Sequence, residues 1–384
     1  MREWFDQIPD RRRIGAVKWD VKENELPMWV ADMDFAAAPA IRAALENRVA
    51  HGVFGYSDLP AAWNDAYVAW WRRRHGLEMD PDALIFTTGV IPAISTAVRK
   101  LTTPAEKAVV LTPVYNIFFN SIVNNGRVPV EVPLLYANGR YEIDFPALEA
   151  ALADPQVSLL IFCNPHNPVG RIWTRAELAA VGELCKKHGV TVISDEIHCD
   201  ITLPGTGYVP FAAAGETCAA ISVTCLSPGK CFNLAGLGSA AVYVPDPFLR
   251  HKMWRALNTD EVAEPNAFAV EATLAAFNES EDWVKEMNAY VAESRRFAED
   301  YIREKIPALV PVHGEATYLM WIDCAAVTDD AADFCRRLRE ETGLFLNAGN
   351  VYGKTGETFV RLNLATSRKN VEDGMDRLRR FVNA

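Results

Sequence analysis

The run Ala219-Ala220-Ile221-Ser222-Val223-Thr224-Cys225-Leu226 is followed at once by Ser227-Pro228-Gly229-Lys230. Its mainly apolar character, without a polar alternation, predicts a strand buried on both faces, as in a mostly parallel sheet. Further runs of this kind are residues 83–86, 108–111, 158–163, 190–194 and 239–244. Helical patterns lie between them, including residues 91–101 and 174–188, the latter opened by the capping-box pair Thr174 and Glu177. This alternation predicts a doubly wound α/β sheet.

After Asp246 the sequence pattern becomes mainly helical. Helices are predicted for residues 265–277, 281–304, 331–341 and 368–382, and strands for residues 317–322 and 358–364. These elements predict a second, smaller α+β domain. We therefore expect residues 1–48 to be an N-terminal segment that joins the small domain, residues 49–280 to form the large domain, and residues 281–384 to form the C-terminal small domain.

Polar side chains occur where three of the predicted strands end. Asn167 lies in Asn164-Pro165-His166-Asn167-Pro168-Val169-Gly170, Asp195 ends the run 190–194, and Lys230 follows the run 219–226. In open α/β sheets, ligands gather at the carboxyl ends of the strands, so we expect these groups to meet there. An amine, an amide and a carboxylate are what a pyridoxal phosphate (PLP) site needs, as Schiff-base lysine, orienting donor and partner of the ring nitrogen.

Taken singly, the candidate residues also have ordinary structural interpretations. Asp195 could cap a turn, although a buried carboxylate at a strand end needs a cation beside it. His198 could be a core histidine rather than a partner of the cofactor's phenolic oxygen. Tyr115 could be a core residue rather than a ring that stacks on a flat cofactor. The turn Gly89-Val90-Ile91 could be a plain strand-to-helix connection or a phosphate site at a helix N-terminus.

Composition excludes several classes of partner. The net charge of −11 and a pI near 5.2 argue against nucleic acid, whose binding requires clustered Lys and Arg. The stretch Met1-Arg2-Glu3-Trp4-Phe5-Asp6 lacks the apolar region of a secretory signal, and no run reaches the roughly 18 apolar residues of a membrane span, so we expect a cytoplasmic protein with no membrane partner. The eight cysteines form no Cys-x-x-Cys pair, so no metal site is predicted.

One phosphate-binding motif is discounted. Gly353-Lys354-Thr355 resembles the end of a P-loop, but Ala348 stands where the first glycine is required. No clear helix pattern follows it. We therefore expect no nucleotide site there.

Five motifs occur in one order along nearly the whole chain: Thr112-Pro113-x-Tyr115, Asn164-Pro165-x-Asn167-Pro168-x-Gly170, Asp195-Glu196-x-His198, Ser227-x-x-Lys230 and Phe359-Val360-Arg361-Leu362-Asn363. In this combination the chain resembles the fold type I PLP-dependent enzymes, the aspartate aminotransferase (class I/II) superfamily. Two more stretches, Leu26-Pro27-Met28-Trp29-Val30-Ala31-Asp32-Met33-Asp34-Phe35 and His51-Gly52-Val53-Phe54-Gly55-Tyr56, resemble its MalY/PatB branch, the cystathionine β-lyases and related cysteine-S-conjugate β-lyases.

The resemblance implies the PLP-dependent transferase fold type I, and it implies roles for the matching residues. Lys230 would hold PLP and then act as the base at the substrate Cα, while Asp195 would keep the ring nitrogen protonated. The remaining cofactor contacts would be Tyr115 on the ring, Asn167 and His198 at the ring oxygen, and Gly89, Val90 and Ser227 at the phosphate, with Ile91 in the same turn. Gly238 stands where several relatives carry a phosphate-binding arginine, so backbone donors and hydroxyls must contribute more.

Substrate contacts are also implied by the resemblance. Arg361 would bind the substrate carboxylate through two parallel hydrogen bonds, a geometry that lysine cannot copy. The backbone near Ala31 and the amide of Asn167 would assist it. Tyr56 would act as a catalytic and substrate-binding residue that reaches across from a second subunit, which implies a homodimer with shared active sites.

The implied reaction is the α,β-elimination of L-cystathionine or a similar cysteine thioether, a small sulfur amino acid, to a thiol, pyruvate and ammonia. An aminotransferase of class I/II is the main alternative, because it uses the same residues around the lysine. A regulatory protein on the same fold, whose main role is to bind a partner, is a lower alternative, since the sequence has no appended DNA-binding segment or basic tail.

Overall fold

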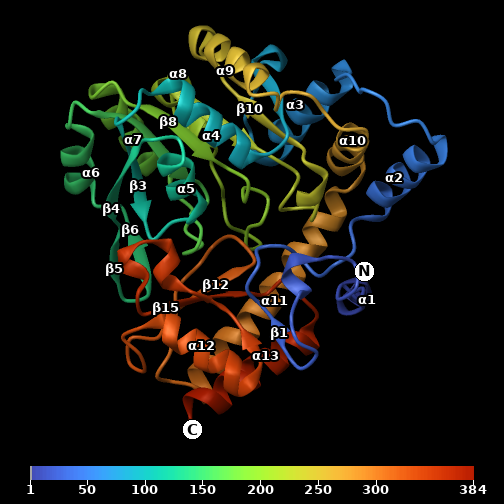
Figure 1. Cartoon of the computed structure of the whole chain (residues 1–384), viewed down its shortest axis with the longest axis vertical. Helices are drawn as coiled ribbons and strands as arrows, with labels where there is room; N and C mark the ends of the chain where they lie inside the picture. Colours follow the sequence, from blue (N-terminus) through green and yellow to red (C-terminus); the bar gives the residue numbers. More distant parts are fainter. Residues whose placement is uncertain (1) are drawn as a thin grey trace.

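A seven-stranded sheet lies at the centre of the protein in a computed structural model that describes residues 2–384 (Figure 1). Its strands are β2 (Leu84–Thr87), β3 (Lys107–Thr112), β4 (Val128–Pro133), β7 (Val157–Cys163), β8 (Thr191–Asp195), β9 (Ser222–Leu226) and β10 (Ala240–Tyr243). They are ordered β2-β10-β9-β8-β7-β3-β4. Only β10 runs antiparallel to its neighbours. The prediction of a doubly wound, mostly parallel sheet is therefore confirmed.

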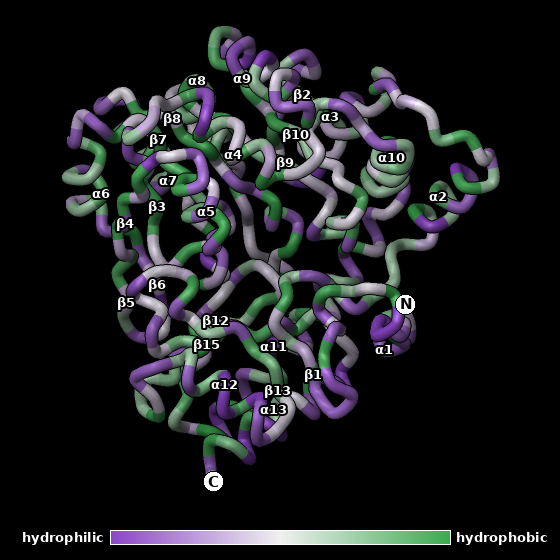
Figure 2. The backbone as a smooth tube through the Cα atoms, viewed as in Figure 1, coloured by the Kyte–Doolittle hydropathy of each residue, from purple (hydrophilic) through white to green (hydrophobic). Residues whose placement is uncertain are grey.

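Helices cover both faces of this sheet, because alternate residues of its strands point to opposite sides. In β3, Val109 and Leu111 pack with α6 (Phe145–Leu152) and α7 (Arg175–Lys187), whereas Ala108 and Val110 pack with α4 (Val90–Leu101) and α5 (Ile117–Val123). The helices of this part are α2 (Pro39–His51), α3 (Ala61–His75), α4 (Val90–Leu101), α5 (Ile117–Val123), α6 (Phe145–Leu152), α7 (Arg175–Lys187), α8 (Glu216–Ala220), α9 (Pro247–Thr259) and α10 (Ala269–Glu279). Figure 2 shows hydrophobic residues concentrated in the central strands, while the outer helices also carry hydrophilic ones.

Several boundaries follow from local sequence signals, whereas one predicted strand is shorter in the structure and one edge strand had not been predicted. The capping box of Thr174 and Glu177 opens α7 as expected. The predicted strand 219–226 is shorter, because residues 216–220 form the helix α8 and only Ser222–Leu226 is extended. The edge strand β4 was missed, since its sequence Val-Pro-Val-Glu-Val-Pro holds two prolines and a charge. Proline is tolerated there because an edge strand has unpaired donor positions.

A smaller antiparallel sheet follows in the order β11-β12-β15-β14. Its strands are β11 (Val310–Pro311), β12 (Leu319–Asp323), β14 (Asn347–Ala348) and β15 (Phe359–Asn363), and the helices α12 (Ala331–Thr342) and α13 (Arg368–Val382) belong to the same part of the chain. Near the N-terminus, α1 (Arg2–Asp6) precedes β1 (Leu26–Pro27), which pairs in parallel with β13 (Leu344–Phe345). A separate hairpin joins β5 (Leu135–Ala137) to β6 (Arg140–Glu142).

The long helix α11 (Glu281–Lys305) connects the two sheets. Its first half packs Trp283 and Met287 into the core of the larger part, and its second half packs Ala298 and Ile302 beside the smaller sheet. The division of the chain after residues 48 and 280 stays a prediction. Within residues 2–384, no helix is long and apolar enough to cross a membrane.

Candidate active site

A cavity of about 290 Å³ opens at the carboxyl ends of the central strands. Many of its lining residues were predicted as site residues: Ala31, Gly89, Val90, Ile91, Tyr115, Asn167, Asp195, His198, Ser227 and Lys230. Others were not singled out for the site from the sequence: Thr88, Pro92, Cys163, Ile197, Gly229, Ala235 and Ser239. Side chains from segments far apart in the sequence thus meet around one space.

Asp195 is the last residue of β8, and in register it lies between Cys163 of β7 and Cys225 of β9. Its side chain faces the cavity but is only 4% exposed. One carboxylate oxygen accepts a hydrogen bond from the Ile197 N–H at 3.1 Å. Burial raises the pKa of Asp195 to about 6, against the opposing effects of that bond and of Lys230. A cation held beside this carboxylate would remove the penalty, and a protonated pyridine nitrogen is such a cation.

Lys230 projects into the same cavity from the turn that follows β9. Its amine donates a hydrogen bond to the backbone carbonyl of Ala31. Burial and the charge of Arg361 lower the pKa of Lys230 to about 8, while Asp32 and Asp195 oppose this shift. A lowered pKa leaves a useful fraction of neutral amine near neutral pH, and a neutral amine is the form that reacts with an aldehyde.

One group of lining residues suits a phosphate. Gly89, Val90 and Ile91 line it at the N-terminus of α4, where first-turn N–H groups have no partner within the helix. The Ser227 hydroxyl also faces this space, donates to the Ser239 carbonyl at 2.7 Å and accepts from the Gly229 N–H at 2.9 Å. These groups could hold a phosphate through backbone donors and a hydroxyl.

Gly238 lines the cavity at the position where the resemblance places a phosphate-binding arginine in several relatives. Its φ of 57° lies in the left-handed region, and a Cβ there would stand 3.2 Å from the Thr88 carbonyl oxygen. An arginine would therefore be strained at this position. The backbone at this position therefore favours glycine.

Arg361 reaches the site from β15 of the smaller sheet, although it does not line the cavity itself. The side chain is buried, donates to Asn167 Oδ1 at 3.3 Å and to the Trp29 carbonyl at 3.0 Å, and lies with its Cζ 5.0 Å from the Tyr352 ring centroid. Arg361 Nε has no hydrogen-bond partner among the described residues. The guanidinium is thus fixed beside the amide of Asn167, with donor capacity left for a carboxylate.

Two other predicted residues have contrasting surroundings. His198 is buried at the cavity wall, and burial holds its pKa well below 6.5, so the imidazole is neutral. Tyr56 is fully exposed in the segment between α2 and α3 and does not line the cavity of its own chain.

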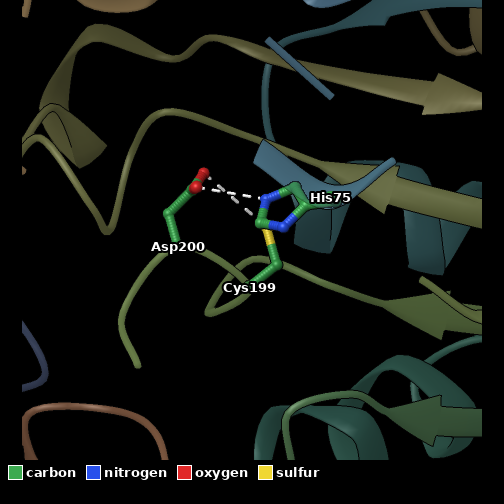
Figure 3. Close-up of side chains that lie close together, drawn as sticks. All are labelled: His75, Cys199 and Asp200. Atoms are coloured by element: carbon green, nitrogen blue, oxygen red, sulfur yellow. Dashed lines mark hydrogen bonds and ion pairs between the residues drawn. The ribbon is translucent and has the colours of Figure 1, made fainter. Parts of the chain in front are cut away.

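A buried polar cluster anchors the loop that carries His198 (Figure 3). Asp200 accepts from Trp70 Nε1 at 2.9 Å and from Arg74 Nε at 3.1 Å, and His75 Nε2 lies 3.1 Å from the same carboxylate. Burial opposes ionisation, but His75 and Arg74 lower the pKa of Asp200 to about 2. Cys199 completes a set of potential metal ligands, yet the Arg74 guanidinium already neutralises the carboxylate. The cluster joins the loop to α3, and the absence of a metal stays a prediction.

Comparison with known proteins places this arrangement in a family. Residues 25–378 match the sequence profile described as aminotransferase class I and II. The chain belongs to the aminotransferase class I and II family. The resemblance noted from the motifs is thereby confirmed, as is the fold type I architecture.

The aminotransferase class I and II assignment agrees with individual similarities. The chain is 41% identical to cystathionine β-lyase PatB of Bacillus subtilis (strain 168), over 98% of each chain. Among solved structures, cystalysin from Treponema denticola, which contains a pyridoxal 5′-phosphate cofactor, has a TM-score of 0.96 and 29% identity, with 99% of this chain and 98% of cystalysin covered. The PLP-bound C-S lyase from Staphylococcus hominis has a TM-score of 0.93 and 29% identity, with coverages of 99% and 98%.

Proposed function

We propose that the protein is a PLP-dependent carbon–sulfur β-lyase that cleaves L-cystathionine or a related cysteine S-conjugate to a thiol, pyruvate and ammonia. The observation that carries the cofactor assignment is the buried carboxylate of Asp195 facing the same cavity as the Lys230 amine. The substrate class is supported by the similarity to PatB over nearly the whole chain and by the resemblance to cystalysin and the C-S lyase.

The residues around the cavity fit PLP. Lys230 would form the covalent link, Asp195 would hold the proton on the ring nitrogen, and Tyr115 would cover the ring. Asn167 and His198 would face the ring oxygen, and the turn at 89–91 with Ser227 would bind the phosphate. When bound, PLP supplies an electron sink for the pair that leaves the Cα–H bond of the substrate.

The chain's own groups account for the remaining steps. Arg361 would bind the substrate carboxylate bidentately, which fixes the Cα–H bond relative to Lys230. The Lys230 amine would then take the Cα proton, and its lowered pKa of about 8 suits a group that both accepts and returns protons near neutral pH. Departure of the β-thiolate would leave 2-aminoacrylate, which water converts to pyruvate and ammonia.

The first prediction concerns the reaction itself. Incubation of the holoenzyme with L-cystathionine should produce pyruvate and thiol in equal amounts over many turnovers, because elimination needs no second substrate. L-alanine, which has no β-leaving group, serves as the control and should yield at most one equivalent of pyruvate per site without an added keto acid, because a half-transamination stops with the cofactor in its amine form. Pyruvate is measured by coupled reduction, and thiol with a chromogenic disulfide.

The aminotransferase remains the second candidate, since the family comprises enzymes of that name. A single stoichiometric conversion that stops with the cofactor in its amine form, and restarts only on addition of a keto acid, would replace the lyase assignment. Continued thiol release without a keto acid supports the lyase.

We also propose a homodimer in which Tyr56 acts in the partner's site. Val53, Phe54 and Tyr56 are exposed by 62%, 53% and 104%, so a short segment presents three large side chains to solvent. Such a patch is typical of a protein interface. In Figure 1 the segment after α2 lies at the edge of the molecule, away from the cavity-lining strands of its own chain.

A mixed dimer tests this arrangement. Chains carrying Tyr56→Phe and Lys230→Ala are each expected to be nearly inactive alone. Their mixture should regain about one quarter of the wild-type activity per dimer site, because random assembly makes half of the dimers mixed and each of these restores one site of two. No recovery in a mixture shown to exchange subunits would place Tyr56 in the site of its own chain.

We propose a cytoplasmic location as well. All eight cysteines are buried free thiols, which suits a reducing compartment. Cell fractionation tests the proposal, and recovery of the chain in an extracellular fraction would contradict it.

A further inference from the structure

The segment of residues 29–33 includes Ala31, which lines the cavity, and its backbone depends on side chains for its hydrogen bonds. The segment lacks regular secondary structure and bends at residues 30–32. Its carbonyl oxygens therefore cannot pair within a helix or sheet, and buried carbonyls require other donors. Asparagine side chains donate hydrogen bonds to four of the five carbonyl oxygens of residues 29–33.

Asn347 and Arg361 donate hydrogen bonds to the same backbone carbonyl, that of Trp29. Its Nδ2 donates to the Trp29 carbonyl at 2.8 Å and lies 3.2 Å from the Tyr352 hydroxyl. Arg361 donates to the same Trp29 carbonyl, and its guanidinium lies against the ring of Tyr352. Asn347 and Arg361 are also directly paired across β14 and β15. Of the three groups that contact the guanidinium, Trp29, Tyr352 and Asn167, the first two are therefore hydrogen-bonded by the Asn347 amide.

Asn363 holds the bend around Ala31. Its Nδ2 donates to the carbonyls of Val30 and Asp32, at 2.6 Å each, and its Oδ1 accepts from the Ala365 N–H at 2.7 Å. The carbonyls of Val30 and Asp32, on either side of Ala31, therefore accept hydrogen bonds from the same amide nitrogen. The Ala31 carbonyl itself accepts from the Lys230 amine and, at 2.9 Å, from the Tyr318 hydroxyl.

A third asparagine, Asn233, bonds the C-terminal end of this segment. Asn233 Nδ2 donates to the carbonyls of Met33 and Phe35, at 2.9 and 3.1 Å, and Asn233 Oδ1 accepts from the Met33 N–H at 3.0 Å. Asn233 follows Lys230 by three residues. Residues 29–33 are thus hydrogen-bonded both to the loop that carries Lys230 and to β15, the strand that carries Arg361.

We infer that Asn347 and Asn363 are positioning residues with separate tasks: Asn347 sets the Arg361 guanidinium through the Trp29 carbonyl, and Asn363 sets the Lys230 amine through the Ala31 carbonyl. Neither side chain lines the cavity. Asn347 acts through its bond to the Trp29 carbonyl, and Asn363 acts through its bonds to the two carbonyls that flank Ala31. The kinetic part of this inference rests on the proposed lyase function.

Single alanine variants separate the two tasks. Asn347→Ala should raise the KM for L-cystathionine about tenfold with kcat within about twofold, because the carboxylate-binding guanidinium loses its support. Asn363→Ala should lower kcat about tenfold with KM within about threefold, because the base loses its fixed position. Asn125→Ala is the matched control, since Asn125 also donates two hydrogen bonds, to Ser95 Oγ and the Ser121 carbonyl, away from the cavity.

A second measurement does not depend on catalysis. Amide hydrogen exchange in the peptide covering residues 28–34 should quicken in both variants of the holoenzyme and stay unchanged in Asn125→Ala. If an alanine variant fails to fold, the serine variant, which keeps one donor, replaces it. The inference would be overturned if kcat and KM changed in the same way in Asn347→Ala and Asn363→Ala. Unaltered hydrogen exchange in this peptide would also overturn it. An inactive wild type with the expected exchange pattern would instead reject the proposed function alone.

Discussion

Replacing Lys230 by alanine is expected to lower the turnover of L-cystathionine about 10⁴-fold or more, because in the proposed mechanism one side chain would both link the cofactor and move the Cα proton. Proton transfer by a placed base alone contributes roughly 10²- to 10⁴-fold. The visible absorbance of lysine-bound PLP should vanish as well. Steady-state pyruvate formation and the absorption spectrum measure the two effects in one preparation.

The control for this experiment is Lys252→Ala, which removes an exposed lysine of α9. It should retain wild-type turnover and spectrum. Borohydride reduction followed by peptide mass analysis should label the peptide of Lys230 in the wild type and in the control. A labelled adduct that persists in Lys230→Ala would show that another amine holds the cofactor.

Replacing Asp195 by alanine is expected to lower kcat roughly 10²- to 10³-fold and to weaken PLP binding. The carboxylate is buried at the end of β8, and its raised pKa of about 6 reflects the penalty of burial without a full counter-charge. A cationic ring nitrogen and this anion stabilise each other. Without the anion, the nitrogen loses its proton and the ring becomes a poorer electron sink. Turnover and PLP titration by fluorescence measure the two losses.

Two variants separate charge from volume at this position. Asp195→Asn keeps the shape and should lose nearly as much activity as Asp195→Ala, since the charge is the effective feature. Glu196→Gln is the matched control, because Glu196 is also buried but is bonded by Ser194, Tyr208 and the Phe211 N–H and does not line the cavity. Wild-type kcat in Asp195→Asn would reject the role of the carboxylate.

Much of the fold could be predicted from local patterns because buried parallel strands and capped helices have local signatures. Residues 190–194, for example, are apolar on both faces and indeed form most of β8. Residues 219–221 show the limit, because a short apolar run does not distinguish a buried helical turn from a strand. There α8 ends at Ala220, and Ile221 stands between it and β9.

The candidate site was predictable where a polar residue ends a strand, as Asp195 does, or lies in the turn just after one, as Lys230 does. It was less predictable where the structure relies on backbone. Asn363 was noticed only as part of a motif, and its two bonds to residues about 330 positions earlier have no sequence signal. Contacts of this kind depend on how the small sheet packs beside the N-terminal segment, which one sequence does not specify.

The continuity of α11 has a consequence for cooperativity. A helix of 25 residues that contributes Trp283 to one core and Ile302 to the other cannot lose its packing in one half without destabilising the other half. We therefore expect the unfolding of the two parts of the chain to be coupled, which thermal unfolding followed by calorimetry would measure. A fragment that began at residue 281 would also expose Trp283 and Met287 to water, so the smaller part is poorly suited to exist alone.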